Sequence, residues 1–309
     1  MQIAILGAGA MGSWFGGRMS VQGHKVQLLT TNLDHIKAIA TEGLTLQSHG
    51  NDEKNINIRI DAGTPENYAG DADLIIVLTK SYQTAAAMHT IAPALDEKTA
   101  VLSLQNGLGN TAAIGEYVKP ANIWVGISMM PVDRIAPGVV ASRGVGDTSF
   151  GHLHDKHHPY AEQIEQAFVG TGISIKHNPD VHSQIWEKVA FNTGMNAVCA
   201  LTHGTPGTIG QLEEGVSLVR AVAAEVAAVA KAEGVAINLD TVFNMIAYAC
   251  EYHGEHKASM LQDLLAGKQT EVDALNGAIV RIAEIHGVET PLNALLGNLV
   301  RLAELGDHA

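Results

Sequence analysis

One segment of the chain, IWEKVAFNTGMN (residues 185–196), carries polar side chains at regular intervals within an apolar pattern. Lys188, Asn192 and Asn196 are each four residues apart, so they share one face of a helix. An ammonium group can donate a proton and attract a carboxylate, and two carboxamides can orient a ligand without adding charge. A helix face packed in a core would carry leucine at these positions. The stripe therefore predicts the wall of a cleft.

A second candidate lies in KASMLQDLLAGKQTEVDALNG (residues 257–277), which places Ser259, Glu271 and Asn276 among apolar residues of helical spacing. A buried glutamate is costly unless it is paired, and Lys188 is the unexplained buried cation. We therefore expect Glu271 to lie beside Lys188. The alternative is that Glu271 lies on an exposed face with its charged neighbours.

The segment GAGAMG (residues 7–12) has glycines in a GxGxxG pattern, with Gly7, Gly9 and Gly12 separated by Ala8, Ala10 and Met11. It follows a strand that begins at residue 2 and opens a helix, which is the context of a dinucleotide-binding loop. Such glycines allow a tight turn and a close approach of the backbone to a pyrophosphate at the helix N-terminus. The alternative is a glycine-rich turn without a ligand.

The residues after the second predicted strand bear on the choice of cofactor. An acidic residue there would bind the ribose hydroxyls of NAD and repel the extra phosphate of NADP. This chain has Thr30, Thr31 and Asn32, neither carboxylate nor arginine, with His35 or Lys37 available to add charge. Hydroxyls and an amide can donate to a phosphate. The segment favours NADP, with NAD as the alternative.

Two further polar residues follow buried strands directly. Lys80 stands in LTKSYQ and Asn106 in LQNGLGN. Ligands of doubly wound sheets bind at the carboxyl ends of the strands, so both residues are candidates for cofactor contact, and solvated loop positions are the alternative.

The elements that must position these residues change character along the chain. Residues 1–179 alternate continuous apolar runs with helical patterns, which predicts a Rossmann-type, doubly wound parallel sheet with an antiparallel addition after Pro131. Residues 180–309 show only helical spacing, with Gly204, Gly234, Gly267 and Gly287 at expected helix ends. We expect an α/β protein with a dinucleotide-binding domain and an all-α domain, and a substrate site between them.

Bulk composition narrows the function further. The chain has 309 residues, a formal net charge of −13 and 46% hydrophobic residues. Because nucleic acids and anionic membrane surfaces select basic faces, neither is expected as a partner. The apolar runs are too short for a membrane span, and the start of the chain has no leader pattern. Two cysteines are too few for a disulfide framework. These features predict a cytoplasmic protein.

The histidine-rich segment GHLHDKHHPY (residues 151–160) suggests a metal site. Dense histidines bind zinc or nickel adventitiously, but this segment lies in a hydrophilic turn away from the glycine loop, with only Asp155 to supplement His152, His154, His157 and His158. We expect no functional metal.

The ordered set GAGAMG, LTKSYQ, QNGLG, WEKVAFNTGMN, SMLQD and TEVDALNG resembles the ketopantoate reductase (2-dehydropantoate 2-reductase) family over almost the whole chain. The resemblance implies NADPH-dependent reduction of ketopantoate to pantoate, a step in pantothenate and coenzyme A biosynthesis, and a helical domain like that of 6-phosphogluconate dehydrogenase. It implies that Lys188 is the general acid with Glu271 near it. Asn192, Asn196 and Ser259 would hold the substrate, and Asn106 would lie between nicotinamide and substrate.

This chain departs from the family pattern at three positions. Thr31 replaces a common arginine, Pro206 replaces an asparagine that contacts the substrate, and Ala197 replaces the proline of an Asn-Pro pair. Because proline has no side-chain donor, one substrate hydrogen bond should be missing. Relatives of the D-2-hydroxyacid (D-mandelate-type) dehydrogenase branch use other 2-oxo acids, so this activity is an alternative. A non-catalytic dinucleotide sensor is another. A small 2-oxo acid is the expected partner, and a homodimer through the helical domain stays open.

Overall fold

The structure, a computed structural model, describes residues 1–48, 55–144, 146–252 and 254–306. Its contacts divide the chain into two compact units. Unit 1 comprises Met1–Gln105 and Asn110–Val181, and unit 2 comprises Asn106–Gly109 and His182–Ala309. Along the chain the division therefore falls two residues after the predicted boundary at 179, and a four-residue loop of the first half is counted with the second.

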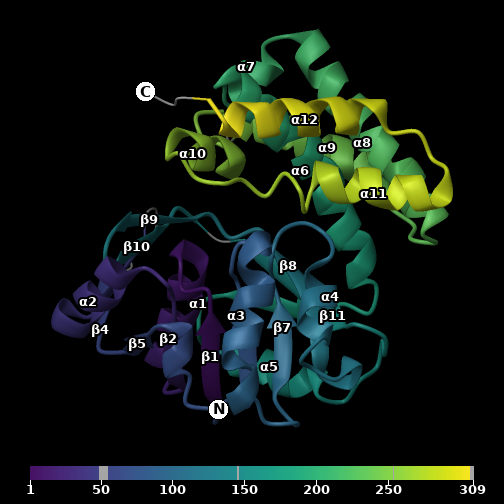
Figure 1. Cartoon of the computed structure of the whole chain (residues 1–309). Helices are drawn as coiled ribbons and strands as arrows, with labels where there is room; N and C mark the ends of the chain where they lie inside the picture. The colour runs from purple at the N-terminus through teal and green to yellow at the C-terminus, as the bar shows by residue number, and fades with distance from the viewer. Residues whose placement is uncertain (49–54, 145, 253, 307–309) are drawn as a thin grey trace. The chain divides into compact units, whose positions relative to one another are not determined.

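Unit 1 contains an eight-stranded sheet in the order β12-β11-β8-β7-β6-β1-β2-β5 (Figure 1). All its neighbouring strands are parallel except β8 and β11, which pair antiparallel. The bounds are β1 (Gln2–Leu6), β2 (Lys25–Leu29), β5 (Asp61–Gly63), β6 (Leu74–Val77), β7 (Ala100–Ser103), β8 (Ile123–Ser128), β11 (Asp147–His152) and β12 (Ser174–His177). The predicted doubly wound α/β fold is confirmed, and β11 is the predicted antiparallel addition.

Helices cover both faces of this sheet, which is why its central strands β6 and β7 are buried at every residue. Alternate residues of β1 enter different cores: Ile3 and Ile5 pack with Phe15 on one face, and Ala4 and Leu6 lie in the core of the other. The helices of unit 1 are α1 (Ala10–Val21), α2 (Leu33–Glu42), α3 (Thr84–Ile91), α4 (Asn110–Gly115) and α5 (Ala161–Phe168), with short 3-10 turns at 65–67, 81–83, 92–94 and 120–122.

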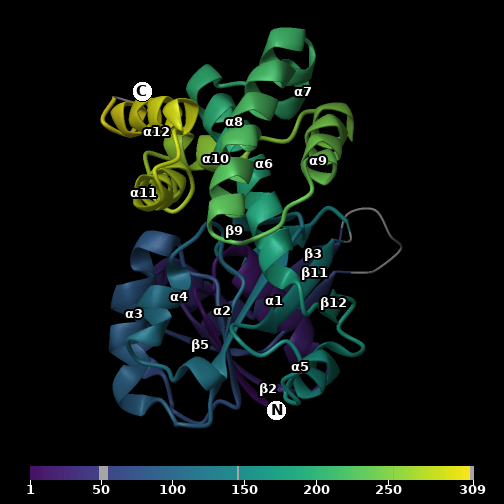
Figure 2. The same cartoon turned by 90° about the vertical axis from the view of Figure 1, so that its right-hand side faces the viewer.

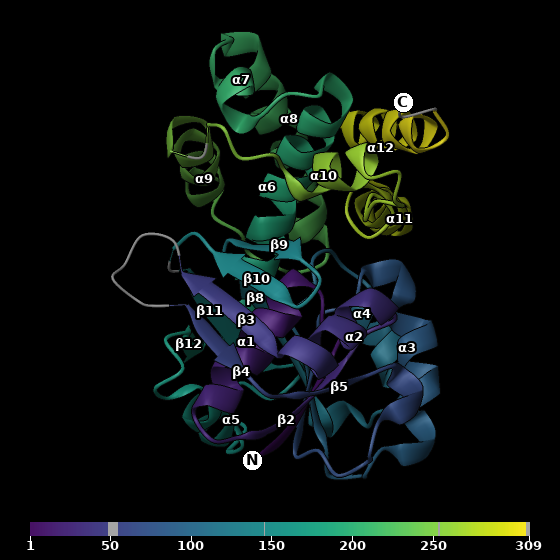
Figure 3. The ribbon, with the colours of Figure 1, turned by 90° about the vertical axis from the view of Figure 1, so that its left-hand side faces the viewer.

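A second, four-stranded sheet in unit 1 was not predicted. Its order is β4-β3-β10-β9, and Figure 3 shows it beside α1. The strands are β3 (Leu44–Ser48), β4 (Ile56–Ile58), β9 (Val132–Ala136) and β10 (Val139–Ser142). The runs LTLQS and INI alternate apolar and polar residues, but they have only five and three residues, too few for a clear periodic signal. LTLQS pairs with INI and with β10, which lies far along the chain.

In the part of unit 2 that the structure describes, the regular elements are all helices, joined by loops (Figure 2). Its helices are α6 (Val181–Thr202, whose first residue is counted with unit 1), α7 (Pro206–Gly210), α8 (Glu213–Ala232), α9 (Leu239–Tyr252), α10 (Ser259–Leu265), α11 (Asn276–His286) and α12 (Pro291–Glu304). Gly234, Gly267 and Gly287 adopt positive φ directly after α8, α10 and α11, as predicted for helix ends. A core rich in alanine and valine packs α6 against α8, α11 and α12.

Candidate active site

The glycine loop between β1 and α1 fits a bound pyrophosphate. Gly7 has a φ of +100°, and a Cβ there would overlap the backbone of Thr79, while a Cβ on Gly12 would overlap the carbonyl of Gly7. Gly9 differs, because a Cβ added to it would meet no protein atom within 4 Å. Packing therefore explains two of the glycines but not Gly9, whose bare backbone suits the close approach of a ligand. No side chain caps α1 and no acid lies in its first turn, so its N-terminal amides remain for a phosphate.

The structure of the segment after β2 corrects the expectation that His35 could add positive charge for the extra phosphate of NADP. Thr31 is exposed, and Asn32 caps α2 by accepting a hydrogen bond from the His35 amide at 2.9 Å. The His35 side chain is fully buried, and burial lowers its pKa to about 4, with Arg134 adding to the shift. His35 therefore cannot supply a positive charge to a phosphate near neutral pH. Lys37 is exposed on α2 and remains a candidate.

Lys80 and Asn106 follow β6 and β7 at their carboxyl ends, as predicted. Sequence reasoning missed the residue that organises this edge within unit 1. The buried amide of Gln105 donates to the carbonyl of Thr79 at 2.9 Å and to the hydroxyl of Thr84 at 2.6 Å. It thereby holds the turn that leads into Lys80. A polar residue directly after a continuous apolar strand was the available signal.

The loop Asn106–Gly109 packs against residues that follow Glu271 in unit 2. The amide of Leu108 donates to the carbonyl of Ala274 at 2.8 Å. Gly107 has a φ of +79°, and a Cβ on it would overlap that same carbonyl. Only glycine satisfies both conditions, so Gly107 fixes the path of the backbone directly after the half-buried Asn106 within unit 2.

The polar stripe of α6 is present as a helix face. Asn192 and Asn196 are each only 7% exposed, and Lys188 is half-buried. Glu271 is likewise 7% exposed, which excludes the alternative that it lies on an exposed face. Burial lowers the pKa of Lys188 to about 8, and the charge of Glu271 opposes that shift. An amine of this kind exchanges a proton near neutral pH.

The other candidate residues of unit 2 differ in exposure and in hydrogen bonding. Ser259 is exposed at the first residue of α10. Pro206 is the buried first residue of α7, which Thr205 caps, so it presents no donor. Asn276 is fully buried and donates to the carbonyl of Thr193 at 3.0 Å and to Asn293 at 3.2 Å. It ties α11 to the middle of α6, and so steadies the polar stripe.

The ring nitrogens of His152 both have protein partners. Nε2 lies 3.0 Å from the carbonyl of Ala121, and Nδ1 accepts from the amides of His154 and Asp155. The ring stacks on His158 at a centroid distance of 4.7 Å. Among the residues that the structure describes, no three His, Cys, Asp or Glu side chains are grouped to hold a metal ion, and no helix is long and apolar enough to cross a membrane.

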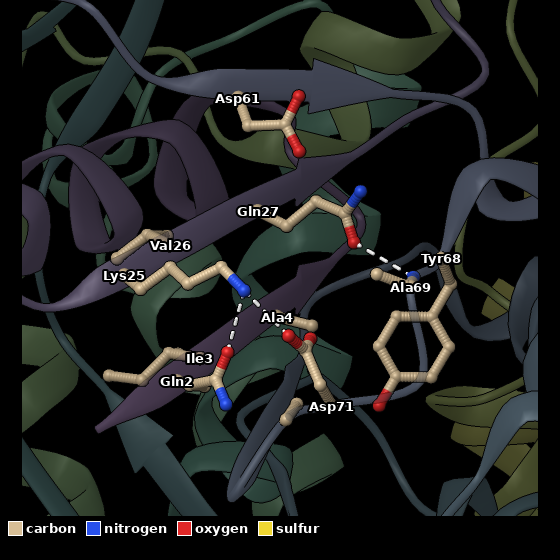
Figure 4. Close-up of a pocket in the computed structure, with 11 residues that line it drawn as sticks. Gln2, Ile3, Ala4, Lys25, Val26, Gln27, Asp61, Tyr68, Ala69 and Asp71 are labelled. Carbon is tan, nitrogen blue, oxygen red and sulfur yellow. Dashed lines mark hydrogen bonds and ion pairs between the residues drawn. The ribbon is translucent and has the colours of Figure 1, made fainter.

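A pocket in unit 1 lies at the opposite, amino ends of β1, β2 and β5 (Figure 4). Its polar groups bond to one another: Lys25 Nζ donates to Gln2 at 2.7 Å and to Asp71 at 2.6 Å. Because these groups are already paired, the glycine loop remains the stronger candidate for the ligand site of unit 1.

A glycine loop of the dinucleotide-binding pattern on a doubly wound sheet, together with a lysine of lowered pKa on a helical unit, is typical of dinucleotide-dependent oxidoreductases. Residues 3–155 match the family model for ketopantoate reductase PanE/ApbA, and residues 180–304 match the model for its C-terminal part. The chain belongs to the ketopantoate reductase PanE/ApbA family.

Known relatives agree with this assignment. A 2-dehydropantoate 2-reductase from Halobacterium salinarum is 32% identical over 289 residues, which are 93% of this chain and 94% of the relative. A PanE/ApbA family ketopantoate reductase from Ralstonia eutropha JMP134 is 30% identical with a TM-score of 0.90, covering 98% of both chains. A structure of D-mandelate dehydrogenase with NADH and anilino(oxo)acetate is 29% identical with a TM-score of 0.93, again covering 98% of both chains.

Proposed function

We propose that this chain catalyses the NADPH-dependent reduction of 2-dehydropantoate to pantoate, with Lys188 as the general acid. The observation that carries the proposal is the lowered pKa of Lys188 near the buried carboxylate of Glu271, on a helix face that also presents Asn192 and Asn196. The family assignment and the 2-dehydropantoate 2-reductases among its relatives support the choice of substrate.

The chemistry of the α6 face follows from its charges. When bound, a reduced nicotinamide would supply a hydride to the carbonyl carbon of the 2-oxo acid. Negative charge then develops on the carbonyl oxygen, and Lys188 Nζ donates a proton to it, which leaves a hydroxyl group on the product and a neutral amine on the enzyme. A positioned acid of this kind contributes about 10²–10⁴-fold in rate. Glu271 keeps enough of the amine protonated for this donation.

The remaining residues bind and orient. Asn192 and Asn196 would hydrogen-bond the substrate, with Ser259 at the start of α10, and Asn106 would contact both the nicotinamide and the substrate. Residues Gly7–Gly12 would cradle the pyrophosphate, and Lys80 would contact the cofactor from the end of β6. For the extra phosphate of NADP, the exposed Thr31 and Lys37 are the available groups, because His35 is buried and neutral.

A second candidate function is supported by Pro206. This position offers no donor to a hydroxylated substrate, and the structurally similar D-mandelate dehydrogenase was solved with NADH. Reduction of a more apolar 2-oxo acid with NADH is therefore the competing proposal.

A panel of 2-oxo acids assayed with NADPH and then NADH tests both proposals. Oxidation of the cofactor is followed by the loss of its near-ultraviolet absorbance. Preference for ketopantoate with NADPH supports the first proposal, and preference for phenylglyoxylate or branched 2-oxo acids with NADH supports the second. If cofactor binds but no 2-oxo acid is turned over, a non-catalytic sensor would replace both. Lys188→Ala should retain cofactor binding and lose most turnover.

The setting of the enzyme is also proposed. A cytoplasmic setting is supported by the two cysteines, Cys199 and Cys250, which are both free and form no disulfide. A homodimer through the helical unit remains a prediction, which light scattering of the purified protein tests.

A further inference from the structure

The mechanism above uses none of the buried polar groups at the start of α2. His35 lies in the first turn of this helix, its side chain is fully buried, and both of its ring nitrogens have partners in unit 1. A buried histidine with two satisfied nitrogens specifies geometry, because a partner that can only donate admits only one neutral tautomer of the ring.

The direction of these hydrogen bonds is fixed by a backbone amide, which can only donate. The backbone amide of Gly138 donates to His35 Nδ1 at 2.9 Å, so Nδ1 carries a lone pair. In a neutral ring the proton is then on Nε2, which lies 2.9 Å from Ser13 Oγ and donates to it. Ser13, itself fully buried, is thereby free to donate its own hydroxyl proton to the carbonyl of Ala8 at 3.3 Å.

The last acceptor of this relay belongs to the glycine loop. The peptide that joins Ala8 to Gly9 is held at one end by the Ser13 hydroxyl and at the other by the Gly9 amide, which donates to the carbonyl of Gly7 at 2.8 Å. This peptide directly precedes the N-terminal amides of α1, which no side chain caps. Its orientation therefore sets the direction of the backbone that faces a pyrophosphate.

The first donor of the relay belongs to the small sheet. Gly138 lies in the turn between β9 and β10, and its carbonyl accepts the amide of Thr45 in β3 at 2.8 Å. The relay thus connects the small sheet, through α2, to the glycine loop.

We propose that His35 is a positioning residue for the dinucleotide: as a neutral imidazole protonated on Nε2, it orders the Ala8–Gly9 peptide through Ser13 and thereby sets cofactor affinity. The proposal rests on the dinucleotide binding proposed above, but not on the identity of the 2-oxo acid. Burial, which lowers the pKa of His35 to about 4, keeps the ring in the required neutral state.

Dissociation constants for NADPH and NADH, measured by nicotinamide fluorescence, test the proposal. Ser13→Ala removes the hydroxyl that links His35 to the Ala8 carbonyl, and His35→Ala removes the centre of the relay. Each should weaken cofactor binding about 5- to 10-fold, the value of one or two net hydrogen bonds. The turnover number at saturating cofactor should stay unchanged, because neither residue takes part in the proposed proton transfer. The double variant should bind as weakly as the weaker single variant and no more, since both break the same chain.

Two further variants separate positioning from stability. His35→Gln keeps an acceptor and a donor on a neutral side chain and should restore affinity to within about 2-fold, the loss expected for an imperfect hydrogen bond. Ile39→Ala is the matched control: this residue is buried on the same helix but outside the relay. It should lower the melting temperature and leave the dissociation constant unchanged.

A readout without cofactor completes the test. Imidazole ¹⁵N shifts of the cofactor-free protein should show the Nε2-protonated neutral tautomer at neutral pH, and Ser13→Ala should shift the His35 Nε2 signal. Unchanged affinity in Ser13→Ala, strictly additive losses in the double variant, or an Nδ1-protonated ring would each overturn the proposal. If the unaltered protein bound neither dinucleotide, the proposed function would fail instead.

Discussion

The pairing of Lys188 with Glu271 leads to a specific prediction for the Glu271→Gln variant. The pKa of Lys188 is about 8 because burial lowers it more than Glu271 raises it. Replacing the carboxylate with a neutral amide of the same shape removes the opposing effect and leaves the burial. An opposite charge in such a position changes a pKa by roughly 1–3 units. The pKa of Lys188 should therefore fall to about 5–7.

The expected effect on the rate follows from the fraction of protonated amine. Reduction needs the ammonium form, so kcat/KM for the 2-oxo acid should fall as pH rises through the pKa. At pH near 8, about half of Lys188 is protonated in the unaltered enzyme, and a fall of roughly 1–3 units leaves about 0.1–10%. Glu271→Gln should therefore lose roughly 5- to 500-fold at that pH, and recover much of the loss at acidic pH.

The assay is the pH profile of kcat/KM at saturating reduced cofactor, with the reverse oxidation as a check of sign. Oxidation needs the neutral amine, so its alkaline plateau should begin at lower pH in the variant. Asp273→Asn is the matched control, because Asp273 is exposed and already paired with Arg301 at 2.7 Å. An equal loss at every pH, or an alkaline limb at an unchanged position, would refute Glu271 as the partner that sets the pKa.

Three further outcomes are expected from other parts of the structure. Gly107→Ala should destabilise the loop and lower turnover at least tenfold, because the residue has a positive φ and its Cβ would overlap Ala274; circular dichroism melts and activity measure both effects. Because His35 titrates at 6.5 when unfolded and at about 4 when folded, about 3 kcal/mol of stability present above pH 6.5 should be lost as pH falls to 4, and His35→Gln should remove that dependence in urea titrations. Thr31→Asp should shift the NADPH/NADH preference of kcat/KM towards NADH by tenfold or more, since a carboxylate repels the extra phosphate; an unaltered ratio would place that phosphate elsewhere.

The sequence alone determined the elements whose signal is local. Continuous apolar runs identified the central strands of the large sheet, since a strand covered on both faces needs apolar side chains at every position. The glycine loop was recognisable because its conformation requires particular residues at fixed offsets. The four-residue spacing of Lys188, Asn192 and Asn196 was enough to place them on one face, because residues four apart are neighbours on a helix surface.

Only the tertiary structure decided which polar residues are buried and what they contact. His35 and Glu271 are both titratable residues, and the sequence around each of them was compatible with an exposed side chain. The fold buries His35 against Gly138, far along the chain, and thereby turns a candidate phosphate ligand into a neutral hydrogen-bond relay. It also buries Glu271 near Lys188.

The backbone pairing of the small sheet and of the loop Asn106–Gly109 was likewise decided only by the tertiary structure. The strands β3 and β10 pair although they lie far apart in the sequence, and the loop packs on Ala274 rather than on its sequence neighbours. Periodicity reports which face of an element is apolar, because that depends on neighbouring residues along the chain. Pairing between distant segments, and the pKa values that result from it, depend on atoms that no local window of sequence contains.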